Sequence, residues 1–144
     1  MVTYFSLEWQ NWSCHPCHDL SSTLLIVSGS KKRITYGELD GRGNVLLQQD
    51  GPLQSSSSRE FFRLVEEIHN KWNGQSDFSV PVCDGSCWKI KIRFSSGVTS
   101  RIKGTVGYPP DGKTIEEALI QLCNEAGIRQ PMLFGCSVPP ETDI

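Results

Sequence analysis

The residues best suited to chemistry in this chain are two pairs of closely spaced cysteines. Cys14 and Cys17 are separated by two residues, and Cys83 and Cys87 by three. Thiolates at such spacings are typical of the two halves of a tetrahedral zinc site, in which His15 or His18 can replace one sulfur. The sequence therefore offers a structural zinc that would tether the N-terminal loop to the base of a later hairpin. The alternative is that these are loop cysteines without a ligand.

Residues 14–18 also have the spacing of two other sites. Two thiols followed by a histidine are typical of c-type haem attachment, but the chain begins without the positive start and apolar centre of an export signal. A Cys-x2-Cys pair also occurs in thiol–disulfide exchange, where a lowered thiol pKa requires a helix directly after the motif. Residues 24–27 predict a strand instead, so we place haem and redox chemistry behind zinc.

Residues 88–106 predict a β-hairpin whose water-facing side is basic. Apolar and basic residues alternate along its first strand with the period of two that a half-buried strand needs. A loop of three residues, Ser-Ser-Gly, pairs Ile90 with Ile102 and gives Gly97 the left-handed conformation that such loops require. A two-residue loop would place Ile102 opposite Lys91, and we therefore predict the three-residue loop.

This register gathers five cations on one face of the hairpin. Lys91 lies opposite Arg101, and Lys89 lies opposite Lys103. Like charges facing each other across a strand pair are unfavourable by roughly a few tenths of a kcal/mol. The face is either a solvated surface relieved by acids such as Glu38 on a neighbouring strand, or a site for an acidic partner. The predicted partner-binding residues are Lys89, Lys91, Arg93, Arg101 and Lys103.

Composition narrows the class of protein and of partner. The chain has 144 residues, 38% hydrophobic and 21% charged, with a net charge of -2, as expected for one globular domain without a bulk attraction for nucleic acid. No aromatic residue lies among the hairpin cations, which disfavours single-stranded nucleic acid because bases need stacking platforms. No apolar run approaches the roughly 20 residues of a membrane helix. We expect a cytoplasmic protein that contacts an acidic protein surface and neither a membrane nor nucleic acid.

The elements that must position these residues predict an α+β fold. We expect an antiparallel sheet of about five to seven strands with two amphipathic helices on one face, in two hairpin-plus-helix units. The expected parts of this single domain, residues 1–144, are a β-rich region at 1–54, helices at 57–73 and 113–127, a hairpin region at 78–106 and a flexible tail at 137–144.

Both predicted helices carry start and stop signals. Ser57 with Glu60, and Thr114 with Glu117, have the spacing of a capping box, in which each side chain bonds an otherwise unpaired backbone N–H. Gly127 follows the second helix and predicts a left-handed cap. We find no Ser/His/Asp arrangement, phosphate loop or metal-hydrolase motif, and we therefore predict that the protein is not an enzyme.

The hairpin segment resembles a group of small uncharacterised bacterial α+β proteins. They share an Asp-Gly-x-x-Trp strand, here residues 84–88, then a turn with glycine at Gly97, and a Tyr-Pro segment before the last helix, here Tyr108 and Pro109. The likeness covers roughly residues 57–135. It implies a bacterial or phage origin and no catalytic residues. We therefore expect a non-catalytic binding protein, of the immunity, inhibitor or anti-defence type.

Overall fold

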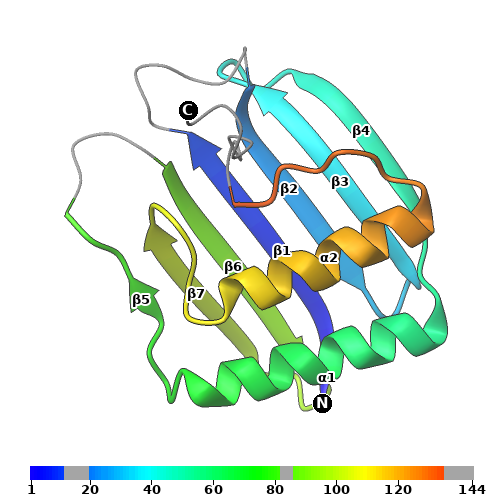
Figure 1. Cartoon of the computed structure of the whole chain (residues 1–144), viewed down its shortest axis with the longest axis vertical. Helices are drawn as coiled ribbons and strands as arrows, with labels where there is room; N and C mark the ends of the chain where they lie inside the picture. The colour runs from blue at the N-terminus through cyan, green and yellow to red at the C-terminus, as the bar shows by residue number, and fades with distance from the viewer. Residues whose placement is uncertain (12–19, 82–85, 135–144) are drawn as a thin grey trace, which may run out of the picture.

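The computed structural model describes residues 1–11, 20–81 and 86–134, and it has two layers (Figure 1). One layer is a seven-stranded, mostly antiparallel sheet, and the other consists of two helices that cross the same face of it. The predicted α+β class is confirmed. The elements are β1 (Val2–Asn11), β2 (Leu20–Ser28), β3 (Arg33–Asp40), β4 (Val45–Pro52), α1 (Ser55–Lys71), β5 (Asp77–Phe78), β6 (Ser86–Phe94), β7 (Thr99–Thr105) and α2 (Gly112–Ala126).

The first strand holds the centre of the sheet. The strand order is β4-β3-β2-β1-β6-β7-β5, so that β1 pairs with β2 on one side and with β6 on the other. The two predicted units therefore share one sheet, with β1 between them. The helices run across the strands in opposite directions (Figure 1), and α2 ends over β4, where Ala126 touches Gly51.

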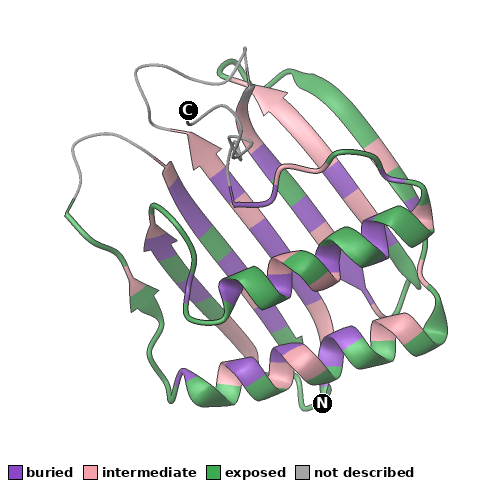
Figure 2. Ribbon diagram, in the orientation of Figure 1, coloured by how far each residue is buried: buried purple, intermediate pink, exposed green. Residues whose placement is uncertain are grey.

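Alternation along the strands decides which side chains form the core. Figure 2 shows buried positions among intermediate or exposed ones along the central strands, and a buried stripe on each helix. The buried residues on the helix side of the sheet include Phe5 and Leu7 in β1, Leu25 and Val27 in β2, Ile34 and Tyr36 in β3, and Trp88, Ile90 and Ile92 in β6. They pack against Phe61 and Val65 of α1 and Leu119 and Cys123 of α2. The predicted burial of Cys123 is confirmed, and burial raises the pKa of its thiol to about 12.

The opposite side of the sheet, which neither helix covers, is called the open face below. Because side chains alternate along a strand, its members are the residues between the core positions. They include Tyr4, Ser6 and Glu8 in β1, Leu24 and Ile26 in β2, Thr35 and Gly37 in β3, Lys89, Lys91 and Arg93 in β6, and Arg101 and Lys103 in β7.

Both helices begin earlier than predicted, and neither N-terminus has a side-chain cap bond. Helix α1 begins two residues before Ser57, whose hydroxyl donates to Oε2 of Glu125 at 3.1 Å and so ties α1 to α2. Helix α2 begins at Gly112 after a left-handed Asp111. The two predicted capping boxes are therefore wrong. The predicted left-handed cap at Gly127, with φ of 82°, is confirmed.

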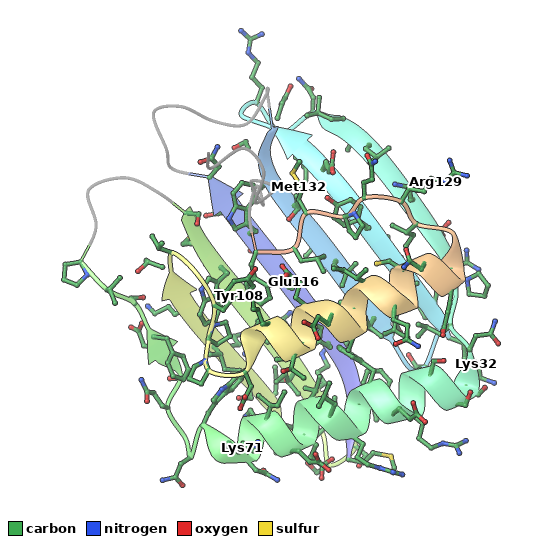
Figure 3. All side chains as sticks on the ribbon, in the orientation of Figure 1. Lys32, Lys71, Tyr108, Glu116, Arg129 and Met132 are labelled. Atoms are coloured by element: carbon green, nitrogen blue, oxygen red, sulfur yellow. The ribbon has the colours of Figure 1, made fainter. Side chains whose placement is uncertain are left out.

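After α2 the chain returns across the helix side of the sheet, where Figure 3 labels Arg129 and Met132. Ile128 and Leu133 are buried in this return segment, residues 128–134. Its backbone is held by side chains of the sheet, because the Met132 N–H donates to the Tyr36 hydroxyl at 2.8 Å. The predicted tail at 137–144 lies outside the described residues.

Candidate functional site

The hairpin of β6 and β7 has the predicted register. Ile90 pairs with Ile102, and the Phe94 N–H donates to the Val98 carbonyl at 2.9 Å. Gly97 has φ of 92°, the left-handed conformation expected in a three-residue loop. The choice of this loop over the two-residue alternative is confirmed.

The register is held by a tryptophan that lies over a glycine. Trp88 pairs with Gly104 and is 1% exposed. A Cβ atom at Gly104 would lie only 2.2 Å from Cζ2 of the Trp88 ring, so this position requires glycine. The ring also stacks on Phe78, with centroids 6.3 Å apart. Since Trp88 points toward the helices, its neighbours along β6 point to the open face.

The five predicted cations share the open face, and they are called the basic patch below: Lys89, Lys91, Arg93, Arg101 and Lys103. Lys91 pairs with Arg101, and Lys89 pairs with Lys103. Lys91 is half-buried and the other four are exposed. Within residues 1–11, 20–81 and 86–134, the patch has one ion pair, from Lys103 Nζ to Asp77 at 3.8 Å.

The acids near the patch differ from the expected one. Glu8 on β1 is the register partner of Lys89, and Asp77 comes from β5. Glu38, which the sequence nominated, points to the helix side, where its Oε2 accepts a hydrogen bond from the Tyr36 hydroxyl at 2.6 Å. That nomination is wrong because β3 is separated from β6 by two strands. The patch thus keeps an excess of positive charge.

Lys91→Glu is expected to stabilise the isolated protein by about 0.5 kcal/mol, since it replaces a like-charge pair with Arg101 by an attractive one. Urea unfolding at low ionic strength measures this gain, which should shrink in high salt. Lys31→Glu, an exposed change of the same charge in the β2–β3 turn, is the control and should leave the free energy of unfolding nearly unchanged. A loss of stability in Lys91→Glu would show that local contacts already neutralise the patch.

Toward β2 and β3 the open face is mostly uncharged, and at its β3–β4 end Arg33 pairs with Asp50 at 3.0 Å. Ser6 lies opposite Lys91, and the next residues in the same row are Ile26 and Thr35. Leu24, 37% exposed, lies beside Gly37 in the neighbouring row. The open face therefore has a basic half on β6 and β7 and a mostly uncharged, partly apolar half on β2 and β3.

One aromatic side chain, missed in the sequence, borders the basic patch. The Arg93 guanidinium lies 4.5 Å from the centroid of the Tyr4 ring, from the neighbouring strand β1. The expected absence of aromatic residues among the cations therefore holds within the hairpin but not in the folded sheet, where β1 adds Tyr4. This face of the Tyr4 ring is already occupied by Arg93, so it does not offer a free stacking platform.

Most of the proposed zinc site lies outside the described residues. Cys14, Cys17 and Cys83 are the three cysteines of that site outside residues 1–11, 20–81 and 86–134. Cys87 is buried on β6, its thiol donates to Oε1 of Gln10 at 3.5 Å, and burial raises its pKa. In the part of the chain that the structure describes, no group of three or more His, Cys, Asp or Glu side chains is placed to hold a metal ion. The zinc site stays a prediction.

His69 and Ser100 form a contact between a helix and the sheet. The His69 Nε2 atom lies 2.9 Å from Oγ of Ser100. The ring packs against Phe94, with centroids 5.3 Å apart, and against Trp72. Burial lowers the pKa of His69 and so favours the neutral ring. This contact holds the C-terminal half of α1 on β7.

A groove of about 1000 Å³ lies between α1 and the turns at one end of the sheet. Arg59, Arg63 and Glu66 line it, over a floor that includes Phe62. The Glu66 carboxylate already meets the N-terminal amine at 3.5 Å. Its mixed charges select no ligand class, in contrast to the single sign of the basic patch.

No protein-family model matches this sequence, and a search of curated proteins finds no match either. Neither α1 nor α2 combines the length and the apolar character that crossing a membrane demands of a helix. Function is therefore inferred from the geometry of the open face.

Proposed function

We propose that this protein is a non-catalytic binding protein whose open face docks onto an acidic surface of another protein. The observation that carries the proposal is the pairing of Lys91 with Arg101 and of Lys89 with Lys103 on a sheet face that neither helix covers. Such an arrangement costs stability in the free protein, and an acidic partner would turn that cost into attraction.

The mostly uncharged half of the open face, on β2 and β3, also supports docking onto another protein. A protein interface needs a desolvated centre as well as a charged rim. Leu24 and Ile26 offer an apolar strip two strands away from Lys91, with Ser6 between them. A partner that places an apolar side chain over this strip and acids beside it would match both halves.

Nucleic acid fits the patch less well. The net charge of the whole chain is -2, so the positive field is local. Tyr4 is the aromatic neighbour of the patch among the described residues, and Arg93 lies over its ring. We therefore propose a protein partner in the cytoplasm, in a bacterial immunity, inhibitor or anti-defence role. The zinc- or thiol-based alternative at Cys14 and Cys17 gains no specific support.

The candidate partners to test are the proteins encoded by genes beside this one. Their affinity for this chain is measured by biolayer interferometry at several salt concentrations. Lys91→Glu combined with Arg101→Glu should weaken binding about 100-fold, or about 2.7 kcal/mol, mainly through a slower association rate. Arg59→Glu combined with Arg63→Glu, on α1, changes the net charge equally and should leave affinity almost unchanged. Equal losses in the two double variants, or none in the first, would contradict docking through the basic patch.

A further inference from the structure

The strand β4 forms one edge of the sheet and exposes three consecutive apolar side chains. Val45, Leu46 and Leu47 are 60%, 49% and 37% exposed. In the described part of the chain β4 has one neighbouring strand, β3, so its outer side faces no other strand. An exposed apolar edge of this kind is a template for pairing with another strand.

The backbone of β4 also offers hydrogen-bonding groups on that outer side. The Leu53 N–H donates to the Lys32 carbonyl at 3.0 Å, which fixes the phase of the antiparallel ladder. Bonded and non-bonded pairs alternate along such a ladder. The pairs of Gln48 with Gly37 and of Asp50 with Thr35 are therefore non-bonded. Gln48 and Asp50 direct their N–H and C=O groups away from β3.

We propose that a second copy of this chain pairs antiparallel with β4 about a two-fold axis, joining the two sheets into one. Two-fold symmetry allows registers centred on Gln48 or on Gln49. The register centred on Gln48 places Asp50 opposite Leu46 of the other copy. The register centred on Gln49 places Asp50 opposite Gln48 of the other copy. Neither register brings like charges together, and Asp50 is already neutralised by Arg33 at 3.0 Å. The irregular pairing at Leu46 leaves Leu47 to Gly51 as a regular stretch that both registers use.

At the other side of the sheet, cover by β5 and charge on β7 disfavour the same pairing. The short strand β5 covers β7 only at Lys103 and Gly104. A two-fold axis at Arg101 would place two Arg101 side chains opposite each other, and an axis at Ile102 would place Arg101 opposite Lys103. Both registers oppose like charges. Pairing through β4 meets neither obstacle, and three strands, β3, β2 and β1, separate β4 from the basic patch.

Sedimentation equilibrium of the full chain, without any partner, tests the dimer. Gln48→Pro removes an outward N–H but no bond to β3, and proline is tolerated on edge strands in that position. It should raise the dimer dissociation constant about 30-fold, because two symmetry-related hydrogen bonds are lost. The matched control, Gln48→Ser, keeps the N–H and should leave the constant nearly unchanged.

A second variant decides the matter if Gln48→Pro fails to fold. Leu46→Glu removes apolar contact area and brings a carboxylate near Asp50 of the second copy in either register, so dimerisation should be lost. Val98→Glu changes another exposed apolar residue, in the β6–β7 turn, and should not affect dimerisation. A wild-type chain that is monomeric up to about 1 mM, or a dimer that survives Leu46→Glu, overturns the proposal. Because no partner is present, failure here leaves the proposed docking face untouched.

Discussion

Gly104→Ala is expected to destabilise this protein by about 3 kcal/mol, although it adds a single methyl group. The new Cβ would lie 2.2 Å from the Trp88 ring, which is 1% exposed and held between Phe78 and Phe134. The ring has no free volume to move into, so the strands must separate. Gly37→Ala is the matched control, because its Cβ would meet nothing closer than the Leu47 carbonyl at 3.8 Å. Urea unfolding should show almost no change for that variant.

A double-mutant cycle separates the clash from a general intolerance of side chains at Gly104. Trp88→Leu alone opens a cavity and should cost about 3 kcal/mol. Combined with Gly104→Ala, it should cost clearly less than the sum of the two single changes, because the methyl group enters space that the ring has left. Additive losses would show that the backbone conformation at Gly104, and not the tryptophan, demands glycine.

The contact of Trp88 with Gly104 is one reason why the hairpin could be predicted from the sequence. Its register depends on residues close together in the chain: Gly97 for the loop, Ile90 opposite Ile102, and Gly104 opposite Trp88. Each of these constraints excludes a one-residue slip independently. Once the register is fixed, strand alternation places all five cations on the open face, so their positions could be predicted as well.

The neighbours of the hairpin could not be predicted in the same way. The pairing of β1 with β6 joins residues 75 to 92 positions apart, such as Tyr4 and Arg93, and nothing local to either strand selects it. Any of several strands with alternating apolar residues was compatible with that place in the sheet. The aromatic beside the patch, Tyr4, and the acid Glu8 were missed for this reason. Asp77 was missed because the two-residue strand β5, which pairs with β7, has no alternating pattern that would reveal it.

The predicted first residues of the two helices were wrong for a different physical reason. The spacing of Ser57 with Glu60 satisfies a capping box, but tertiary contacts extend α1 backward to Ser55 and use the Ser57 hydroxyl to reach Glu125. A capping bond is worth about 1 kcal/mol, which packing of an amphipathic face readily outweighs. The helices themselves were predictable because their apolar stripes are long, whereas their first residues depend on what lies beside them.

Tyr36→Phe is expected to cost about 2 kcal/mol, the second large effect, because one hydroxyl serves two partners in the interior. Tyr36 is fully buried, donates to Glu38 at 2.6 Å and accepts from the Met132 N–H at 2.8 Å. Phenylalanine would leave that N–H and one carboxylate oxygen without their bond. The return segment would keep the bond from the Thr23 hydroxyl to the Met132 carbonyl, at 2.9 Å, and the bond from the Arg129 N–H to Oε1 of Gln49, at 3.3 Å. Hydrogen exchange at the Met132 amide should accelerate.

A matched control for Tyr36→Phe is the same substitution at Tyr108, a tyrosine on the surface. Tyr108 is 40% exposed, and its hydroxyl donates to Glu116 at 3.0 Å (Figure 3). Tyr108→Phe should cost under about 0.5 kcal/mol, since water replaces the lost bond. If both variants lost the same stability, the Tyr36 hydroxyl would be no more than an ordinary surface contact. A loss confined to Tyr36→Phe, with faster exchange at Met132, would establish that the buried Tyr36 hydroxyl contributes more to holding the return segment on the sheet than a surface hydroxyl does.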